Sequence, residues 1–222
     1  MDLPGANENR LIRTVRQFEI INRLLTRSRG AIRRYLLRDA VARKLEEVTL
    51  LDIGAGGCDI GRWFIEACKR RGIHGRVICL DYDERIVAYA RKTCADQPEI
   101  SVVLGDAGEL RRMEEVDYVF ANHFLHHLPE EGILELLPMI AQKARYGFLL
   151  NDLKRSRLSY FGYTCLAGLF LHGSFAFYDG RLSIRRGFRR EELVTLTEGC
   201  GEKTIIRSLA PGRLLVVGGA LS

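Results

Sequence analysis

Small and acidic residues follow an apolar stretch near position 50 of this 222-residue chain, and they are suited to binding a charged small molecule. Residues 49–53 read as a buried strand of a parallel sheet, and a helical pattern resumes after residue 61. Between them, glycines allow a tight turn or the close approach of a ligand to the backbone. The residues that we expect to bind a ligand here are Asp52, Gly54, Ala55, Gly56 and Cys58.

This strand–loop–helix unit is typical of nucleotide binding, but two common motifs are absent from it. The dinucleotide pattern G-x-G-x-x-G fails at Asp59 when read from Gly54, and at Cys58 when read from Gly56. A phosphate-binding Walker loop is excluded because no Gly-Lys-Ser/Thr follows. The carboxylate of Asp52 would repel a pyrophosphate, whereas it would hold the cationic end of an amino acid.

A second acid stands at the end of another apolar stretch, 76–81. Asp81 lies 25 residues after Gly56, close to the spacing at which nucleotide-binding folds place a carboxylate on ribose hydroxyls. We therefore expect Asp81 to bind a ribose and Tyr82 to lie along an adenine ring.

The pattern D-x-G-x-G from Asp52 to Gly56 resembles motif I of the class I S-adenosylmethionine (SAM) methyltransferases, with Cys58 where the family usually has a third glycine. The resemblance extends over residues 48–222. It is strongest to ubiquinone- and menaquinone-biosynthesis methylases. The pattern of residues 149–153 and 179–188 is similar to bacterial methyltransferases that modify phenolic polyketides or quinones.

The resemblance implies SAM as the cofactor and a doubly wound α/β fold. In that fold a mostly parallel, seven-stranded Rossmann-like sheet ends in a hairpin, and here a helical cap would precede it. In the family, an acid after the third strand and the next backbone N–H bind the adenine edge, which assigns this role to Asp106 and Ala107. Asn122, at the end of the fourth strand, is a further expected cofactor contact.

Three histidines follow this fourth strand, in a segment that the family places beside the sulfonium and its methyl group. Histidine accepts a proton near neutral pH, so His123, His126 and His127 are candidates for a general base. Asp152, at the end of the fifth strand, is a fourth candidate, and we favour His127. No metal is expected, because no nearby Cys, Asp or Glu completes a set of ligands.

The positive charge of the chain is confined to its beginning. Residues 1–46 hold eleven basic and five acidic residues, which accounts for the whole formal charge of +6. Apolar residues recur there at helical spacing, so we expect a basic helical cap over 1–46 and a methyltransferase domain over 47–222. Within that domain, residues 154–187 are rich in aromatic side chains and predict an insertion that contacts the substrate.

Other features of the sequence indicate the compartment and the partners of the protein. The six cysteines are scattered and no signal peptide precedes the first helix, which favours a reducing cytoplasm. No segment predicts a transmembrane helix, although the basic helices leave peripheral membrane contact open. Few aromatic residues accompany the arginines, which disfavours a nucleic-acid partner. The sequence does not indicate an oligomeric state.

These observations predict a SAM-dependent methyltransferase that acts on a small, apolar, hydroxylated acceptor such as a phenol, quinol or polyketide, by O-methylation. Two alternatives stay open at this point. One is an RNA methyltransferase that uses the basic N-terminal segment, and the other is a SAM-binding module without catalytic activity. A nicotinamide dehydrogenase is disfavoured because no Tyr-x-x-x-Lys is present.

Overall fold

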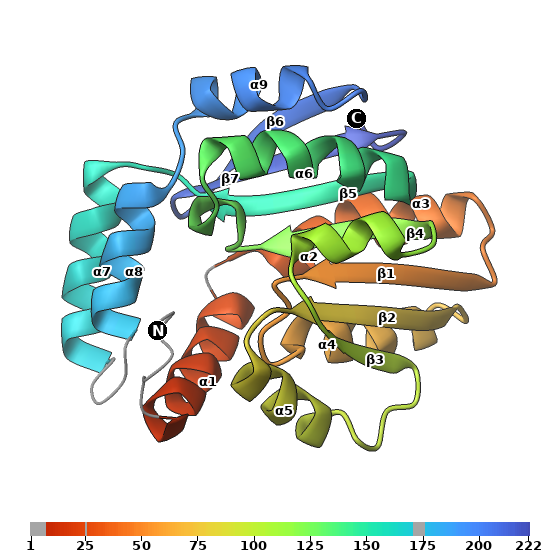
Figure 1. The fold of residues 1–222 in the computed structure, drawn as a ribbon, viewed down its shortest axis with the longest axis horizontal. Helices are drawn as coiled ribbons and strands as arrows, with labels where there is room; N and C mark the ends of the chain where they lie inside the picture. The colour runs from red at the N-terminus through yellow and green to blue at the C-terminus, as the bar shows by residue number, and fades with distance from the viewer. Residues whose placement is uncertain (1–7, 25, 171–175) are drawn as a thin grey trace.

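The computed structural model describes residues 8–24, 26–170 and 176–222. Within these residues seven strands form one sheet in the order β3-β2-β1-β4-β5-β7-β6 (Figure 1). The first five strands run parallel, and β7 is antiparallel to both β5 and β6. The predicted fold, a mostly parallel sheet that closes with a hairpin, is confirmed. The strands are β1 Glu47–Ile53, β2 His74–Asp81, β3 Ile100–Leu104, β4 Val116–Asn122, β5 Ala144–Leu153, β6 Thr204–Leu209 and β7 Arg213–Gly219.

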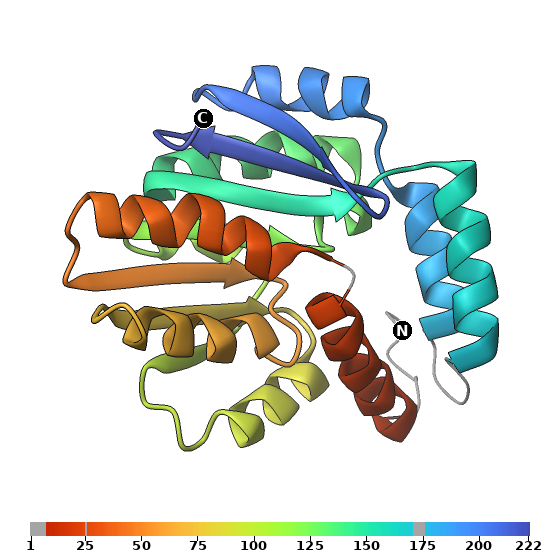
Figure 2. The same ribbon diagram turned by 180° about the vertical axis from the view of Figure 1, so that it is seen from behind.

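Helices cover both faces of this sheet, and the central strands are buried along most of their length for that reason. The helical segments of one face are α2 Ser28–Ile32, η1 Arg33–Leu37, α3 Arg38–Ala42, α4 Asp59–Lys69 and α5 Glu84–Thr93 (Figure 2). Those of the other face are η2 Ala107–Arg112, α6 Glu130–Lys143 and α9 Arg190–Glu198. None of the described helices has the length and apolar character needed to cross a bilayer.

The N-terminal segment consists of two parts with different packing. Residues 28–42 form a continuous helical run whose Ile32, Leu36 and Leu37 are fully buried in the core beneath the sheet. In contrast, α1 (Glu8–Leu24) lies at one end of the sheet, where Leu11 and Val15 join a small apolar cluster. The domain boundary at residue 46 stays a prediction, and residues 1–7 and 25 of the expected cap lie outside the described residues.

The expected insertion contains two helices, α7 (Arg157–Phe170) and α8 (Ala176–Arg186). They pack against each other at the edge of the sheet where the parallel strands end (Figure 1). Helix α8 also contacts α1, so the two segments face each other across this edge. Residues 171–175 of the insertion lie outside the described residues. The carboxyl ends of the strands are therefore flanked by α1 on one side and by the α7–α8 hairpin on the other.

Candidate active site

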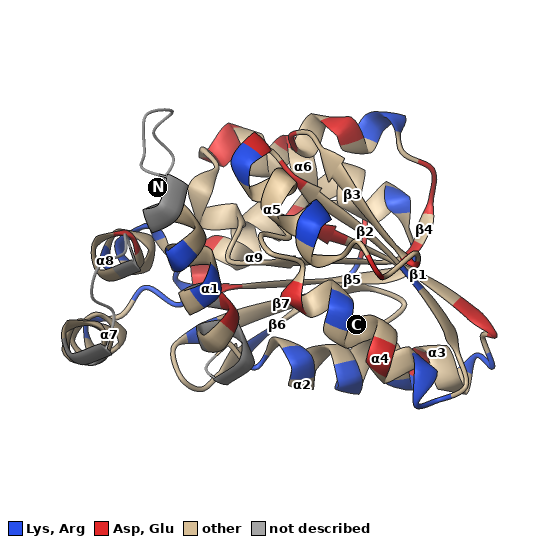
Figure 3. Ribbon diagram, turned by 90° about the horizontal axis from the view of Figure 1, so that it is seen from below, with Lys and Arg blue, Asp and Glu red and all other residues tan. Residues whose placement is uncertain are grey.

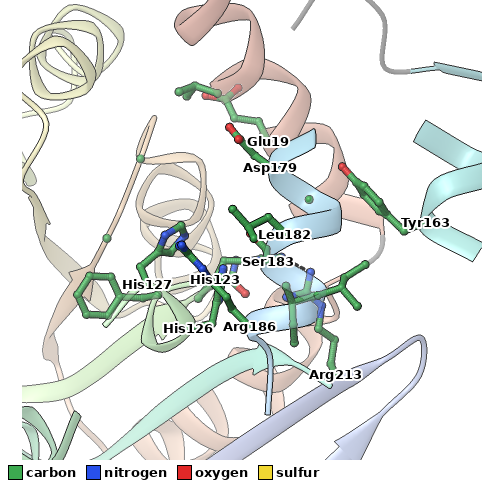
Figure 4. Close-up of a pocket in the computed structure, with 18 of the residues that line it drawn as sticks. Glu19, His123, His126, His127, Tyr163, Asp179, Leu182, Ser183, Arg186 and Arg213 are labelled. Atoms are coloured by element: carbon green, nitrogen blue, oxygen red, sulfur yellow. Dashed lines mark hydrogen bonds between the residues drawn. The ribbon is translucent and has the colours of Figure 1, made fainter. Parts of the chain in front are cut away.

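A cavity of about 700 Å³ opens at the carboxyl edge of the sheet, between α1 and the α7–α8 hairpin. We call its two ends the glycine-loop half, formed by lining residues within 52–60 and 81–86, and the hairpin half, formed by lining residues within 158–163, 179–186 and 210–213. Residues 122–127, here called the histidine loop, begin with the last residue of β4 and lie between the two halves (Figure 4). This position is the point where the strand order reverses, at which open α/β sheets bind ligands.

The glycine loop, residues 54–58, has a backbone that favours small residues. Gly54 and Gly56 have φ values of 68° and 55°, in the left-handed region that glycine adopts without strain. The amides of Gly54 and Ala55 donate to the Leu80 carbonyl oxygen at 2.8 and 3.1 Å, which ties the loop to β2. A Cβ at Gly54 would come within 2.7 Å of the Phe124 ring. The loop is thus held close to both β2 and the histidine loop.

Asp81 links the glycine loop to the start of α5. Its carboxylate accepts hydrogen bonds from the amides of Gly56 at 2.9 Å and Asp83 at 3.1 Å. Burial raises the pKa of Asp81 above its usual value, and the bonds from these amides limit the rise. The carboxylate lines the cavity, so it is placed to accept hydrogen bonds from hydroxyl groups of a ligand.

Asp52 is an acid whose charge is poorly compensated. It is 3% exposed, and its Oδ2 has no hydrogen-bond partner among the described residues. Burial and the nearby carboxylates of Asp59 and Asp81 raise its pKa well above the usual value. A cationic group at this point of the cavity would stabilise the ionised form and provide the missing donor.

A buried polar network holds Asn122 at the end of β4. The Ser28 hydroxyl donates to Oδ1 of Asn122 at 2.9 Å, and Nδ2 of Asn151 donates to the same oxygen at 3.1 Å. Nδ2 of Asn151 also donates to the Thr26 carbonyl oxygen at 2.8 Å. The network connects the start of α2 to the ends of β4 and β5, so Asn122 has a structural role beside its place in the cavity wall.

His126 and Asp152 form a buried pair across two neighbouring strand ends. Nδ1 of His126 lies 2.7 Å from Oδ1 of Asp152, and the His126 amide donates to Oδ2 at 3.2 Å. Burial alone would raise the pKa of Asp152. Electrostatic attraction to His126 and the hydrogen bond with it, together with the Leu153 amide, nevertheless hold this pKa below its usual value. With Nδ1 directed at the carboxylate, Nε2 of His126 is left without a partner among the described residues. This is the arrangement of an oriented proton acceptor.

His123 and Arg213 form a second pair, and both residues line the cavity. His123 has a φ of 59°, uncommon for a residue with a side chain, and its Nε2 contacts the Arg213 guanidinium. Burial, the positive charge of Arg213 and the neighbouring histidines lower the pKa of His123 well below its usual value. Burial also lowers the pKa of Arg213 to about 10, although Asp152 opposes the shift. At neutral pH we therefore expect a neutral imidazole beside a buried cation.

Most of the sequence-predicted site residues meet in the wall of this cavity. The residues that line it are Asp52, Gly54, Ala55, Gly56, Asp81, Tyr82, Asn122, His123, His126 and His127. Asp152 does not line the cavity, and it contacts Nδ1 of His126, which does. Cys58 directly precedes α4, and its thiol lies among Cys79 and Cys94 in the core.

Asp106 and Ala107 lie outside the cavity wall, where Asp106 accepts a hydrogen bond from the Gly108 amide at 2.7 Å and caps η2. Their contact with adenine stays a prediction. Among the described residues, no group of three or more His, Cys, Asp or Glu side chains is arranged to hold a metal ion.

Two features of the site escaped sequence reasoning. Arg213 belongs to no motif, and its signal in the sequence is a single cation at the start of the apolar stretch 213–217. Glu19 and Val15 of α1 reach the cavity because Gly57 has no side chain to keep α1 away from the loop. Neither feature belongs to a motif, so only the fold brings them to the site.

Comparison with known proteins agrees with this geometry. Residues 50–147 match the family described as "Methyltransferase domain". Residues 50–147 thus carry a methyltransferase domain. The matched residues of this methyltransferase run from β1 through β4 into β5, and thus include the glycine loop and the histidine loop. No match is found among curated proteins.

Several solved structures share the fold of the methyltransferase. A SAM-dependent methyltransferase from Aquifex aeolicus has 15% identity and a TM-score of 0.60, covering 96% of this chain and 98% of that one. Human N-acetylserotonin methyltransferase in complex with SAM has 13% identity and a TM-score of 0.66, covering 96% of this chain but 56% of that one. Magnesium protoporphyrin IX methyltransferase from Synechocystis PCC 6803 has 15% identity and a TM-score of 0.57, covering 98% and 89%.

The residues of the glycine-loop half fit the cofactor SAM, which supplies an electrophilic methyl group when it is bound. The unsatisfied carboxylate oxygen of Asp52 suits the amino group of the methionine portion, and Asp81 suits the ribose hydroxyls. A Cβ at Gly56 would meet no heavy atom within 4 Å, so open space lies against this part of the loop.

Proposed function

We propose that this methyltransferase transfers a methyl group to an oxygen atom of a small, apolar, hydroxylated acceptor such as a phenol, quinol or polyketide. The observation that carries the proposal is the continuity of one cavity. The glycine-loop half suits SAM, the hairpin half has room for an acceptor, and an oriented histidine lies between them. Reacting groups held in line in such a cavity gain much of their rate from positioning alone.

His126 is the residue that we assign as general base, in preference to His127. Its Nδ1 is fixed by Asp152 at 2.7 Å, which leaves Nε2 to take the acceptor's proton. As the hydroxyl proton passes to Nε2, the acceptor oxygen forms a bond to the methyl carbon. The bond from that carbon to the sulfonium sulfur breaks, and its electron pair stays on sulfur. Asp152 stabilises the resulting imidazolium, since its depressed pKa keeps it ionised at neutral pH.

The hairpin half suits an apolar acceptor because of its walls. Leu158, Tyr163 and Leu182 line it from α7 and α8, while Leu153 and Pro211 line it from the strand ends. Closure of these helices over the acceptor would exclude water from the reacting oxygen. Solved structures of similar fold include human N-acetylserotonin methyltransferase and a pyocyanin biosynthetic protein, and their names support a small-molecule acceptor.

Three of the basic residues that would serve an RNA substrate contact neighbouring side chains. Blue segments run along α2 and α3 in Figure 3, but Arg29 and Arg33 lie over the Trp63 ring, at 5.6 and 5.2 Å from its centroid. Arg43 pairs with Asp39 at 2.6 Å. These contacts support a role in packing the helical layer, and we therefore keep the small-molecule acceptor as the proposal.

The experiment that tests the proposal is a methyl-transfer assay. Purified protein with SAM carrying a labelled methyl group is offered alkylphenols and alkylhydroquinones, with and without a ring carboxylate, and a pool of structured RNA. We expect labelled methyl ethers of at least one phenolic compound and no labelled RNA. The proposal is wrong if the protein binds SAM but labels only RNA, or labels carbon or nitrogen acceptors alone.

A further inference from the structure

Arg213 is a buried cation that the glycine loop and the proton acceptor leave unexplained. It opens β7, is 4% exposed and lines the cavity. Figure 4 shows its side chain rising from the strand toward Ser183 of α8, at the hairpin half. Burying a permanent charge is costly unless its donors are satisfied, so such an arginine in a cavity wall calls for a partner.

The protein satisfies this guanidinium only in part. One of its terminal nitrogens contacts Nε2 of His123, which we expect to be a neutral acceptor. The other, Nη1, is buried with no hydrogen-bond partner among the described residues. Asp152 balances the charge at longer range, but its carboxylate is already engaged by His126 and Leu153. An unpaired donor of a cation thus belongs to a residue that lines the part of the cavity that we assign to the acceptor.

We propose that Arg213 binds an anionic oxygen of the acceptor, so that the preferred substrates are hydroxylated aromatic or enolic acids with a carboxylate close to the hydroxyl that is methylated. This inference rests on the function proposed above and narrows its substrate class. A carboxylate is a better partner than a neutral carbonyl, because it balances the charge of the guanidinium and can accept two parallel hydrogen bonds from it. The planar fork of arginine also fixes the orientation of a carboxylate, which would present the neighbouring hydroxyl to His126.

The position of Arg213 separates its role from cofactor binding. It belongs to β7, and two strands, β5 and β4, lie between it and the β1 end that carries Asp52. We therefore expect Arg213 to influence the affinity for the acceptor and to leave the affinity for SAM unchanged.

The test compares two probes that differ only by one carboxylate, 6-pentylsalicylate and 3-pentylphenol. Their dissociation constants are measured by calorimetry on protein saturated with S-adenosylhomocysteine. We expect the wild type to bind the salicylate at least tenfold more tightly, and Arg213→Met to lose this preference while it keeps its affinity for S-adenosylhomocysteine. Arg213→Lys, which keeps the charge, should retain part of the preference and guards against a folding defect in Arg213→Met. Arg207→Met is the matched control, since Arg207 lies on β6 of the same hairpin and is exposed outside the cavity wall.

Three results would overturn the inference: equal affinity of the wild type for both probes, no binding of either probe, or a preference that survives in Arg213→Met. Methyl transfer is followed separately with the same proteins. Arg213-dependent binding of the salicylate without transfer to its oxygen would contradict the proposed function and leave the binding role of Arg213 in place. Transfer to 3-pentylphenol with no preference for the salicylate would contradict the role of Arg213 alone.

Discussion

The two halves of the cavity are built in different ways. The glycine-loop half comes from short segments that directly follow β1 and β2, and its groups are set by local backbone geometry. The hairpin half comes from the α7–α8 hairpin and from the turn before β7, which follows α8 only after more than twenty further residues, so the two meet only in the fold. The first half suits a cofactor with a fixed structure, whereas the second can change its side chains without disturbing the sheet. Function is commonly varied in this way, by loops on a rigid scaffold.

The largest expected effect concerns the histidine loop, where the two halves meet. His126→Gln should lower the rate of methyl transfer about 10²- to 10⁴-fold, because the oriented proton acceptor is lost. His127→Gln is the matched control and should have a much smaller effect, since His127 is not the partner of Asp152. The rates are measured at saturating SAM on the acceptor found in the assay above. Equal losses in both variants would remove the distinction between the two histidines.

Asp152→Asn tests the pairing of His126 with Asp152 at the residue that lies outside the cavity lining. We expect a lower rate and an unchanged affinity for SAM, because Asp152 lies outside the cavity lining. The pKa of Asp152 is lower in the folded protein, so its charge adds stability above the unfolded pKa of about 3.9, and this stability is lost as the pH falls through the folded pKa. In urea unfolding, the free energy of unfolding of the variant should therefore fall less steeply at acidic pH than that of the wild type. A pH dependence identical to that of the wild type would contradict the pairing.

A change at Asp52 should separate stability from cofactor binding in the glycine-loop half. Asp52→Asn should weaken SAM binding at least tenfold, or about 1.4 kcal/mol, measured by calorimetry. Because burial raises the folded pKa of Asp52, the unfolded chain releases this proton more readily, and stability falls as the pH rises from about 4 toward the folded pKa. The variant without ligand should therefore be more stable than the wild type at pH 7. A less stable variant with full affinity would show that Asp52 has only a structural role.

The smallest expected effect distinguishes two glycines of one loop. Gly54→Ala and Gly56→Ala both place a side chain at positive φ, which costs about 1 kcal/mol. Only Gly54→Ala also crowds the Phe124 ring. We expect the free energy of unfolding to fall further for Gly54→Ala than for Gly56→Ala in urea titrations. Equal losses would mean that the histidine loop moves away at little cost.

The sequence predicted the glycine-loop half better than the hairpin half, for a physical reason. Asp52, the glycines and Asp81 act through the strand ends that carry them, and an apolar stretch followed by an acid predicts such an end directly. In contrast, the pairing of His126 with Asp152 depends on which residue of the short turn η3 (Leu125–His127) faces β5. Neighbouring histidines look alike in the sequence, so the pattern of residues alone does not distinguish His126 from His127.

Cys58 and Arg213 show that a motif does not determine where a side chain lies in the fold. Cys58 stands in the motif, and its thiol lies near Cys79 and Cys94 in the core, so its contact with the cofactor stays a prediction. Arg213 stands in no motif and reaches the cavity because β7 lies beside β5. The direction of a side chain and the neighbour of a strand both follow from tertiary packing, and short-range patterns do not contain them.

A crystal structure with bound S-adenosylhomocysteine is the most direct test of the central claim, which is that the strand-end acids and the histidine loop form one methyl-transfer cavity. We expect the amino group of the ligand on the carboxylate of Asp52, its ribose hydroxyls on Asp81, and its sulfur facing the histidine loop and the hairpin half. A ligand bound elsewhere on the protein, or bound with its sulfur turned away from His126, would contradict the account.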